Sequence, residues 1–250
     1  MLDLPANTEA GTLLPPVVLL HEGLGCVALW RDFPTQLHAR LGCRVVAYSR
    51  RGYGQSTPLA AGQRQARHLC VMHEEAQQVL PAVCAELGLD KPYLIGHSDG
   101  ASIAFIYAAC FPEHLSGMCL MAPHLFCEPM CVAAIERAKA EFEHSDWPIK
   151  MRKYHIDPEA TFYAWADVWL HPRFRAWDLR AYLPFLAAHS DRILALQGAE
   201  DPYGTPAHIS VFAAHRLIAN CQHSPHLEHP LQVLNALEAH YMRVCGEIKT

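Results

Sequence analysis

One pentapeptide carries the clearest chemical signal in the chain, the run Gly96-His97-Ser98-Asp99-Gly100. It fits the pattern G-x-S-x-G, follows an apolar run at 92–95 and precedes a helical pattern at 101–111. A turn this tight between a strand and a helix needs glycine on both sides. It exposes the serine hydroxyl at the helix N-terminus, where the helix dipole favours negative charge. We therefore predict that Ser98 is a nucleophile; the alternative is that it only caps the helix.

A serine hydroxyl is a weak nucleophile at neutral pH, so it needs a base that is itself oriented by a carboxylate. Asp201 follows the apolar run at 193–196, and His223 lies in the loop before the last helical pattern. The carboxyl ends of parallel strands open on one side of a sheet, so loops that are distant in sequence can meet there. We predict that Asp201 and His223 complete a triad with Ser98, and that Glu200 is the rival acid.

The rest of the chain alternates between strand-like and helical patterns. Short continuous apolar runs are typical of strands that are buried on both faces, while apolar residues spaced by three and four indicate helices. This alternation predicts an α/β fold with a mostly parallel, doubly wound sheet of about six strands. The expected strands span 16–21, 43–48, 92–95, 117–121, 193–196 and 217–219, and the expected helices span 27–41, 64–87, 101–111, 206–215 and 231–244.

The alternation stops in the second half of the chain. Residues 124–188 carry helical patterns and many aromatic side chains, with no strand-like run. We interpret this segment as a helical insert that forms a lid, and residues 1–123 and 189–250 as the core domain. Three side chains from the insert or from loops at the carboxyl ends of strands are expected to line a substrate pocket: His124, Trp165 and Tyr203.

With two further motifs, the chain resembles the α/β-hydrolase superfamily over nearly its whole length. The run His21-Glu-Gly-Leu-Gly25 is similar to the segment that binds the oxyanion in that family, and Arg51-Gly-Tyr-Gly-Gln-Ser56 is similar to its R-G-x-G-x-S loop. Asp201 and His223 match the acid and the histidine of the family. Since the N-terminal part is short, the resemblance implies that the first two, antiparallel strands of the family are absent or reduced.

Two residues depart from the family pattern. Glu22 stands where the family has a glycine after the histidine of the oxyanion segment. Gln222 stands where the family has a glycine before the catalytic histidine. His223 remains the better match to that histidine, with His226 as the alternative.

The resemblance implies a serine hydrolase that works through an acyl-enzyme. Ser98 would attack a carbonyl carbon, His223 would move the proton, and Asp201 would hold the imidazole. A small to medium carboxylic ester or thioester is the expected substrate; a carbon–carbon bond in a ring-fission diketone and a lactone are alternatives for the same triad. The backbone amides expected to bind the oxyanion belong to Asp99 and to Gly23 or Leu24.

Other classes of protein compete with this interpretation. Residues 23–28 also fit G-x-G-x-x-[GA], and Arg50 and Arg51 follow the next strand, which would suit an NADP-dependent oxidoreductase but leaves the triad residues unexplained. A ligand receptor of the same fold with slow turnover is a second alternative. We expect no metal and no cofactor. The side chains that could bind a metal by spacing alone are His68, Cys70, His73, His223, His226 and His229.

Composition limits the partners. Lys and Arg number 20 against 25 Asp and Glu, a formal net charge of −5. This balance predicts no basic face for nucleic acid or an anionic membrane, and leaves a small molecule as the expected partner. The chain has ten cysteines without a C-x-x-C pair, no basic, apolar leader, and no apolar run near the roughly 18 residues of a membrane span. We expect a soluble cytoplasmic protein.

Overall fold

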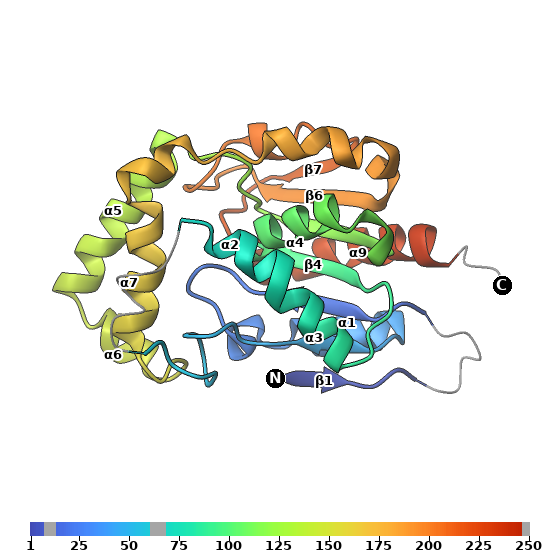
Figure 1. The fold of residues 1–250 in the computed structure, drawn as a ribbon, viewed down its shortest axis with the longest axis horizontal. Helices are drawn as coiled ribbons and strands as arrows, with labels where there is room; N and C mark the ends of the chain where they lie inside the picture. The colour runs from blue at the N-terminus through green and yellow to red at the C-terminus, as the bar shows by residue number, and fades with distance from the viewer. Residues whose placement is uncertain (8–13, 61–68, 247–250) are drawn as a thin grey trace.

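A seven-stranded sheet forms the centre of the computed structural model, which describes residues 1–7, 14–60 and 69–246 (Figure 1). The strand order is β1-β3-β2-β4-β5-β6-β7; β1 pairs with β3 in the antiparallel sense, and the other neighbours are parallel. The predicted mostly parallel α/β sheet is thus confirmed, with one short antiparallel strand added at its edge. The strands are β1 (Leu2–Leu4), β2 (Val17–Leu20), β3 (Val45–Ala47), β4 (Tyr93–His97), β5 (Gly117–Met121), β6 (Ile193–Gly198) and β7 (Ala214–Ile218).

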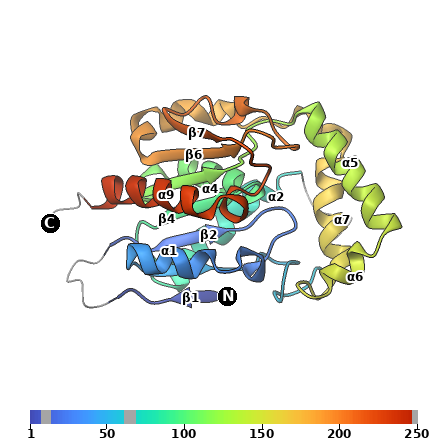
Figure 2. The same ribbon diagram turned by 180° about the vertical axis from the view of Figure 1, so that it is seen from behind.

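Helices cover both faces of the sheet, which explains why its central strands are buried at every position and mostly apolar. Side chains alternate between faces along a strand: Val17 and Leu19 pack on the face under α1 and α9, and Val18 and Leu20 pack on the face under α3 and α4. Figures 1 and 2 show these two layers from opposite sides. The helices of these layers are α1 (Phe33–Leu41), α2 (Val71–Glu74), α3 (Leu80–Glu86), α4 (Asp99–Cys110), α8 (Pro225–Glu228) and α9 (Pro230–Cys245).

Two of the expected helices are interrupted. The helix expected at 27–41 divides into a 3-10 turn at Val27–Trp30 and α1, because Arg31 has a φ of 51°, outside helical space. The helix expected at 64–87 contains a π-helical stretch at Glu75–Val79. Pro81 lies two positions after this stretch, and it disfavours a regular helix before it because proline has no amide hydrogen to donate. Residues 64–68 of that expectation lie outside the described residues.

One expected helix is wrong. Residues 206–215 form a single 3-10 turn at Pro206–His208 and then lead into β7, which begins at Ala214. This strand lies at the edge of the sheet, and three of its five side chains are exposed. An edge strand of this kind has no continuous apolar run, so the sequence pattern does not reveal where it begins. The strand starts earlier than the expected 217–219.

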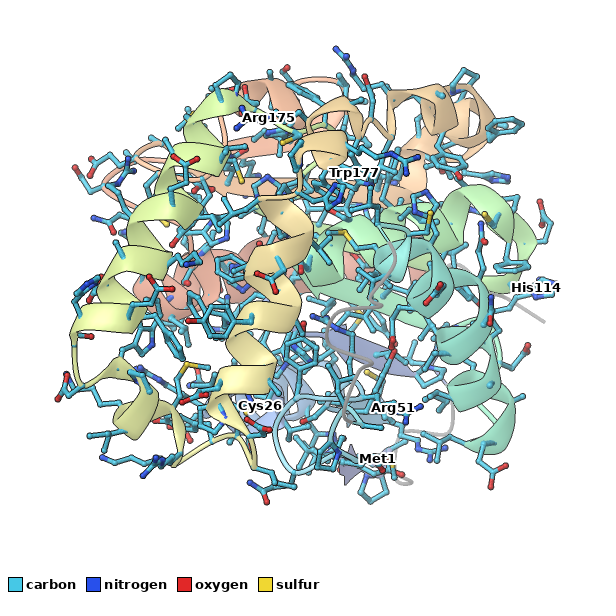
Figure 3. The ribbon with its side chains drawn as sticks, turned by 60° about the vertical axis from the view of Figure 1, so that its left-hand side comes forward. Met1, Cys26, Arg51, His114, Arg175 and Trp177 are labelled. Atoms are coloured by element: carbon cyan, nitrogen blue, oxygen red, sulfur yellow. The ribbon has the colours of Figure 1, made fainter. Side chains whose placement is uncertain are left out.

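Three further helices stand together beyond one end of the sheet (Figure 1). They are α5 (Pro129–His144), α6 (Trp147–Met151) and α7 (Pro158–Trp169), and 3-10 segments at Pro172–Ala176 and Arg180–Arg192 lead back to β6. Figure 3 shows α5 and α7 in front of the sheet, with Arg175 and Trp177 near their upper ends. The segments that lead into and out of this group of helices lie side by side, since the Leu179 amide donates to the Leu125 carbonyl at 2.6 Å. Many aromatic side chains pack these helices together; the Phe142 and Phe162 rings stack 3.9 Å apart.

No helix in the described ranges combines the length and hydrophobicity that crossing a bilayer requires. All ten cysteines lie in those ranges, and each is a free thiol. Most are buried, and burial raises the pKa of Cys84 to about 11. These thiols therefore contribute to packing as small apolar groups.

Candidate active site

The turn between β4 and α4 holds Ser98 in a strained backbone conformation, with φ 52° and ψ −117°. Its glycines are needed for close packing rather than for unusual dihedral angles. A Cβ at Gly96 would lie 2.3 Å from the Gly100 carbonyl oxygen, and a Cβ at Gly100 would lie 2.0 Å from the Leu20 carbonyl oxygen. The sharp turn expected from G-x-S-x-G is therefore present, and it places Ser98 at the N-terminus of α4.

Ser98, His223 and Asp201 form one chain of hydrogen bonds. His223 Nδ1 lies 2.9 Å from both carboxylate oxygens of Asp201, and His223 Nε2 lies 2.9 Å from Ser98 Oγ. Because a carboxylate can only accept, Nδ1 carries the proton, and Nε2 is left to accept from the serine hydroxyl. Burial opposes the charge on Asp201, but His223 and the amide of Tyr203 lower the pKa of this carboxyl below its usual value. The arrangement can move a proton from Ser98 to His223.

The two rival residues lie elsewhere. Glu200 is exposed, although it directly precedes Asp201. His226 is buried in the core, with its ring 4.8 Å from that of Trp30 and 5.4 Å from that of Phe33. Burial holds the pKa of His226 well below its usual value, so it is a neutral packing residue.

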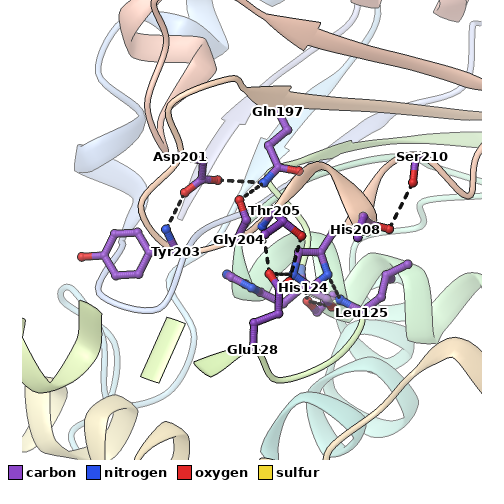
Figure 4. Close-up of polar contacts among 12 residues, drawn as sticks. His124, Leu125, Glu128, Gln197, Asp201, Tyr203, Gly204, Thr205, His208 and Ser210 are labelled. Atoms are coloured by element: carbon purple, nitrogen blue, oxygen red, sulfur yellow. Dashed lines mark hydrogen bonds and ion pairs between the residues drawn. The ribbon is translucent and has the colours of Figure 1, made fainter. Parts of the chain in front are cut away.

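Side chains that the sequence did not single out hold the loop of Asp201 (Figure 4). The Gln197 amide donates to Asp201 Oδ2 at 3.2 Å and to the Gly204 carbonyl at 2.8 Å. Farther along the loop, His208 Nε2 donates to Glu128 at 2.9 Å, and His208 Nδ1 accepts from the Leu125 amide. These bonds tie the loop of Asp201 to the segment that leads into α5.

A cavity of about 110 Å³ lies beside Ser98 and His223. Trp165 lines it and packs against Gly23: a Cβ at Gly23 would lie 2.2 Å from the indole nitrogen, so only glycine leaves room for that ring. The Trp169 indole donates to Asp99 at 3.1 Å and so fixes another wall. All six residues expected to bind an oxyanion or substrate line the cavity, namely Gly23, Leu24, Asp99, His124, Trp165 and Tyr203, and so do the unexpected Glu22, Cys131, Ile135, Trp147 and Trp169.

Arg50 and Arg51 are the two arginines on which the NADP-dependent oxidoreductase alternative depends. Arg50 is buried and donates to the carbonyl oxygens of His21, at 2.5 Å, and of Glu22, at 3.0 Å. It therefore holds the backbone of the segment at residues 21–25. Arg51 is exposed. No group of metal-ligating side chains occurs among the described residues, and His68 lies outside them.

Comparisons with known proteins bear on the fold. The family model described as "alpha/beta hydrolase fold" matches residues 15–167. Among curated proteins, the chain is 34% identical over 100 residues to epoxide hydrolase 4 of Mus musculus and 30% identical over 114 residues to protein phosphatase methylesterase 1 of Mus musculus. These matches cover 40% and 45% of this chain, but only 25% and 28% of the relatives' length.

Among solved structures, a carboxylesterase of Nitrososphaera gargenis superposes with a TM-score of 0.69 at 17% identity, covering 98% of this chain and 94% of that one. At this identity the superposition shows a shared fold. The family match spans more than half of the chain, and the superposition extends the likeness to almost all of it. This chain belongs to the α/β-hydrolase fold family.

Proposed function

We propose that the protein is a serine hydrolase that cleaves a small carboxylic ester or thioester through an acyl-enzyme on Ser98. The observation that carries the proposal is the continuous hydrogen-bonded chain from Asp201 through His223 to Ser98, which opens onto a cavity. A serine activated in this way is suited to attack a carbonyl carbon. The methylesterase among the relatives and the carboxylesterase among the structural neighbours support an ester as the substrate.

In the proposed reaction, Ser98 Oγ attacks the carbonyl carbon while its proton passes to His223 Nε2. Asp201 stabilises the imidazolium through the bond to Nδ1. The tetrahedral oxyanion accepts hydrogen bonds from backbone amides of the Asp99 turn and of the Gly23–Leu24 segment. His223 returns the proton to the leaving group, and a water molecule then releases the acyl group by the same steps in reverse.

The cavity supports a short, uncharged acyl group. Its volume of about 110 Å³ is small beside the roughly 300–1,000 Å³ of pockets for drug-sized ligands. None of the described residues that line it is Lys or Arg, while Glu22 and Asp99 are among them. An anionic acyl group would therefore have no Lys or Arg beside it to offset the cost of burying its charge.

We propose that His124, Trp165 and Tyr203 contact the substrate and that α5–α7 act as a lid. His124 is the polar member of this set: burial holds its pKa well below the usual value, and its Nδ1 has no partner among the described residues. Ser102 Oγ holds its backbone on both sides, donating to the carbonyl at 2.7 Å and accepting from the amide at 3.2 Å. A neutral imidazole in the wall of the cavity could contact a second oxygen of the acyl group, so the diketone alternative stays in the test.

The test is a panel of esters of increasing acyl length, with matched thioesters, lactones and diketones, and with Ser98→Ala as the blank. We expect acetyl or butyryl esters to be cleaved at least about tenfold faster, in kcat/KM, than octanoyl esters and than esters of dicarboxylic acids. Cleavage of diketones alone would transfer the proposal to carbon–carbon bonds. No turnover on any substrate, together with a ligand-induced rise in melting temperature, would contradict it and favour a receptor.

A further inference from the structure

Glu22, the residue that departs from the glycine of the family pattern, turns its carboxylate back toward the nucleophile turn. Its Oε2 lies 3.5 Å from Nδ1 of His97, the residue that directly precedes Ser98. The space for this carboxylate comes from Gly25, where a Cβ would lie 2.4 Å from Oε2. The Glu22 carboxylate can therefore take this position only because residue 25 is a glycine.

The other ring nitrogen of His97 reaches the loop of His223. His97 Nε2 lies 2.7 Å from the backbone carbonyl oxygen of His223. A carbonyl can only accept, so Nε2 carries a proton, and a neutral ring would then present a lone pair at Nδ1 to the Glu22 carboxylate. A second proton at Nδ1 removes this repulsion and makes an ion pair, with the His97 side chain 2% and the Glu22 side chain 28% exposed.

The directions in which the pKa values of His97 and Glu22 shift fit an ion pair. Burial would lower the pKa of His97, but Glu22 and the His223 carbonyl outweigh it and raise that pKa. Burial would also raise the pKa of Glu22, but His97 holds it far below the usual value. The other titratable or charged groups near the pair include Cys26, His21, Arg50, His124, His155, Asp201, the His223 ring and the neutral His226.

Residue 22 is thus held at two points. Arg50 binds its carbonyl oxygen at 3.0 Å, and the ring of His97 contacts its carboxylate, with Nδ1 3.5 Å from Oε2. The amides that follow it, at residues 23 and 24, belong to the proposed oxyanion site. Through His97, the same side chain is linked to the backbone of the histidine that is hydrogen-bonded to Ser98.

We propose that Glu22 and His97 are a positioning pair, which fixes the oxyanion segment and the His223 loop relative to each other across the turn that holds Ser98. The proposal rests on the serine-hydrolase function proposed above. Neither residue exchanges a proton with the substrate; the pair keeps two separate loops in the geometry that the transition state needs. Losing one oxyanion donor typically costs about 10²–10³ in rate, and a 1 Å misplacement costs about 10².

The experiment compares Glu22→Leu, which keeps the bulk and removes the link, with Glu22→Gln, whose amide can donate to Nδ1 of a neutral His97. We expect Glu22→Leu to lower kcat/KM for a short ester and the rate of Ser98 labelling by a fluorophosphonate roughly 10- to 100-fold. Glu22→Gln should retain activity within about threefold, because Nε2 can still donate to His223. A matched Glu200→Leu change, at an exposed glutamate outside the pair, should leave activity within about twofold of wild type.

A double-mutant cycle shows whether Glu22 acts through His97. In a His97→Leu background, Glu22→Leu should cause no further loss. Equal activity of Glu22→Leu and wild type, or the same loss in both backgrounds, would overturn the proposal. If His97→Leu does not fold, the contrast between leucine and glutamine at position 22 decides alone, since a role in filling space would be met by leucine.

Proton NMR gives a reading that does not depend on turnover. We expect the imidazole N–H signals of wild-type His97 to include one from Nδ1 that is lost in Glu22→Leu, while the Nε2 signal stays. A wild-type protein that neither cleaves esters nor labels at Ser98 would contradict the proposed function. A wild-type protein that does both, with an unchanged Glu22→Leu variant, would contradict the positioning pair alone.

Discussion

Ser98→Ala is expected to lower kcat/KM for a short p-nitrophenyl ester by at least about 10³-fold and to abolish covalent labelling by a fluorophosphonate. The change removes only the hydroxyl that His223 Nε2 contacts at 2.9 Å. Alanine has a Cβ like serine, so the strain of the turn, with φ 52°, is the same before and after. The loss should therefore appear in chemistry and not in folding, and the melting temperature should stay near that of wild type.

The chain offers a matched control at Ser210. This serine is exposed, and its hydroxyl makes a long contact of 3.5 Å to the Ala207 carbonyl. Ser210→Ala should keep full activity and full labelling. Mass spectrometry of the labelled wild type should place the phosphonate on the peptide that contains residue 98. Hydrolysis by Ser98→Ala at more than about a hundredth of the wild-type rate would refute Ser98 as the nucleophile.

The parts of the fold and site that follow from sequence are those with local causes. The G-x-S-x-G turn could be predicted because glycine at 96 and at 100 is required by backbone contacts within a few residues and against β2. Asp201 and His223 could be placed because each follows a strand of a parallel sheet or precedes the last helix, and such loops open on one side. The structure brings all three side chains together.

The parts that could not be predicted depend on partners that are distant in sequence. His97 reaches the carbonyl of a residue 126 positions away, and His208 reaches Glu128, 80 positions away. Sequence gives the types of these residues but not their contacts. A visible signal is Glu22, which departs from the family pattern and has no explanation in the sequence alone. The structure supplies the reason, since its carboxylate faces His97.

The start of strand β7 could not be predicted for a different reason. Its sequence, Ala-His-Arg-Leu-Ile, has polar residues at two positions and begins directly after residues that suit a helix. At the edge of a sheet a strand needs apolar side chains on few of its positions, so periodicity says little about it. Pairing with β6, from Leu194 opposite Ala214 to Gly198 opposite Ile218, decides its structure.

His223→Ala is the second change with a large expected effect, and its comparison with His226→Ala separates two histidines that are three positions apart. His223→Ala removes the group that lies between Ser98 and Asp201, and should lower kcat/KM by at least about 10³-fold. The buried Asp201 carboxylate keeps its bonds from Gln197 and the Tyr203 amide, so the protein should still fold. The measurement is hydrolysis of the same short ester, with circular dichroism melting of each variant.

His226→Ala should give the opposite balance between activity and stability. Its ring fills the space against Trp30, Phe33 and His97, so alanine leaves a cavity in the core, and the melting temperature should fall by several degrees. Activity below the melting temperature should stay within about tenfold of wild type, because neither Ser98 nor Asp201 loses a partner. The reverse ranking, with His226→Ala inactive and His223→Ala active, would mean that the histidine hydrogen-bonded to Ser98 is not the base. The His97 ring lies near the rings of both His223 and His226. A general disturbance around His97 would therefore lower the activity of the two variants equally, so a difference between them cannot come from that disturbance.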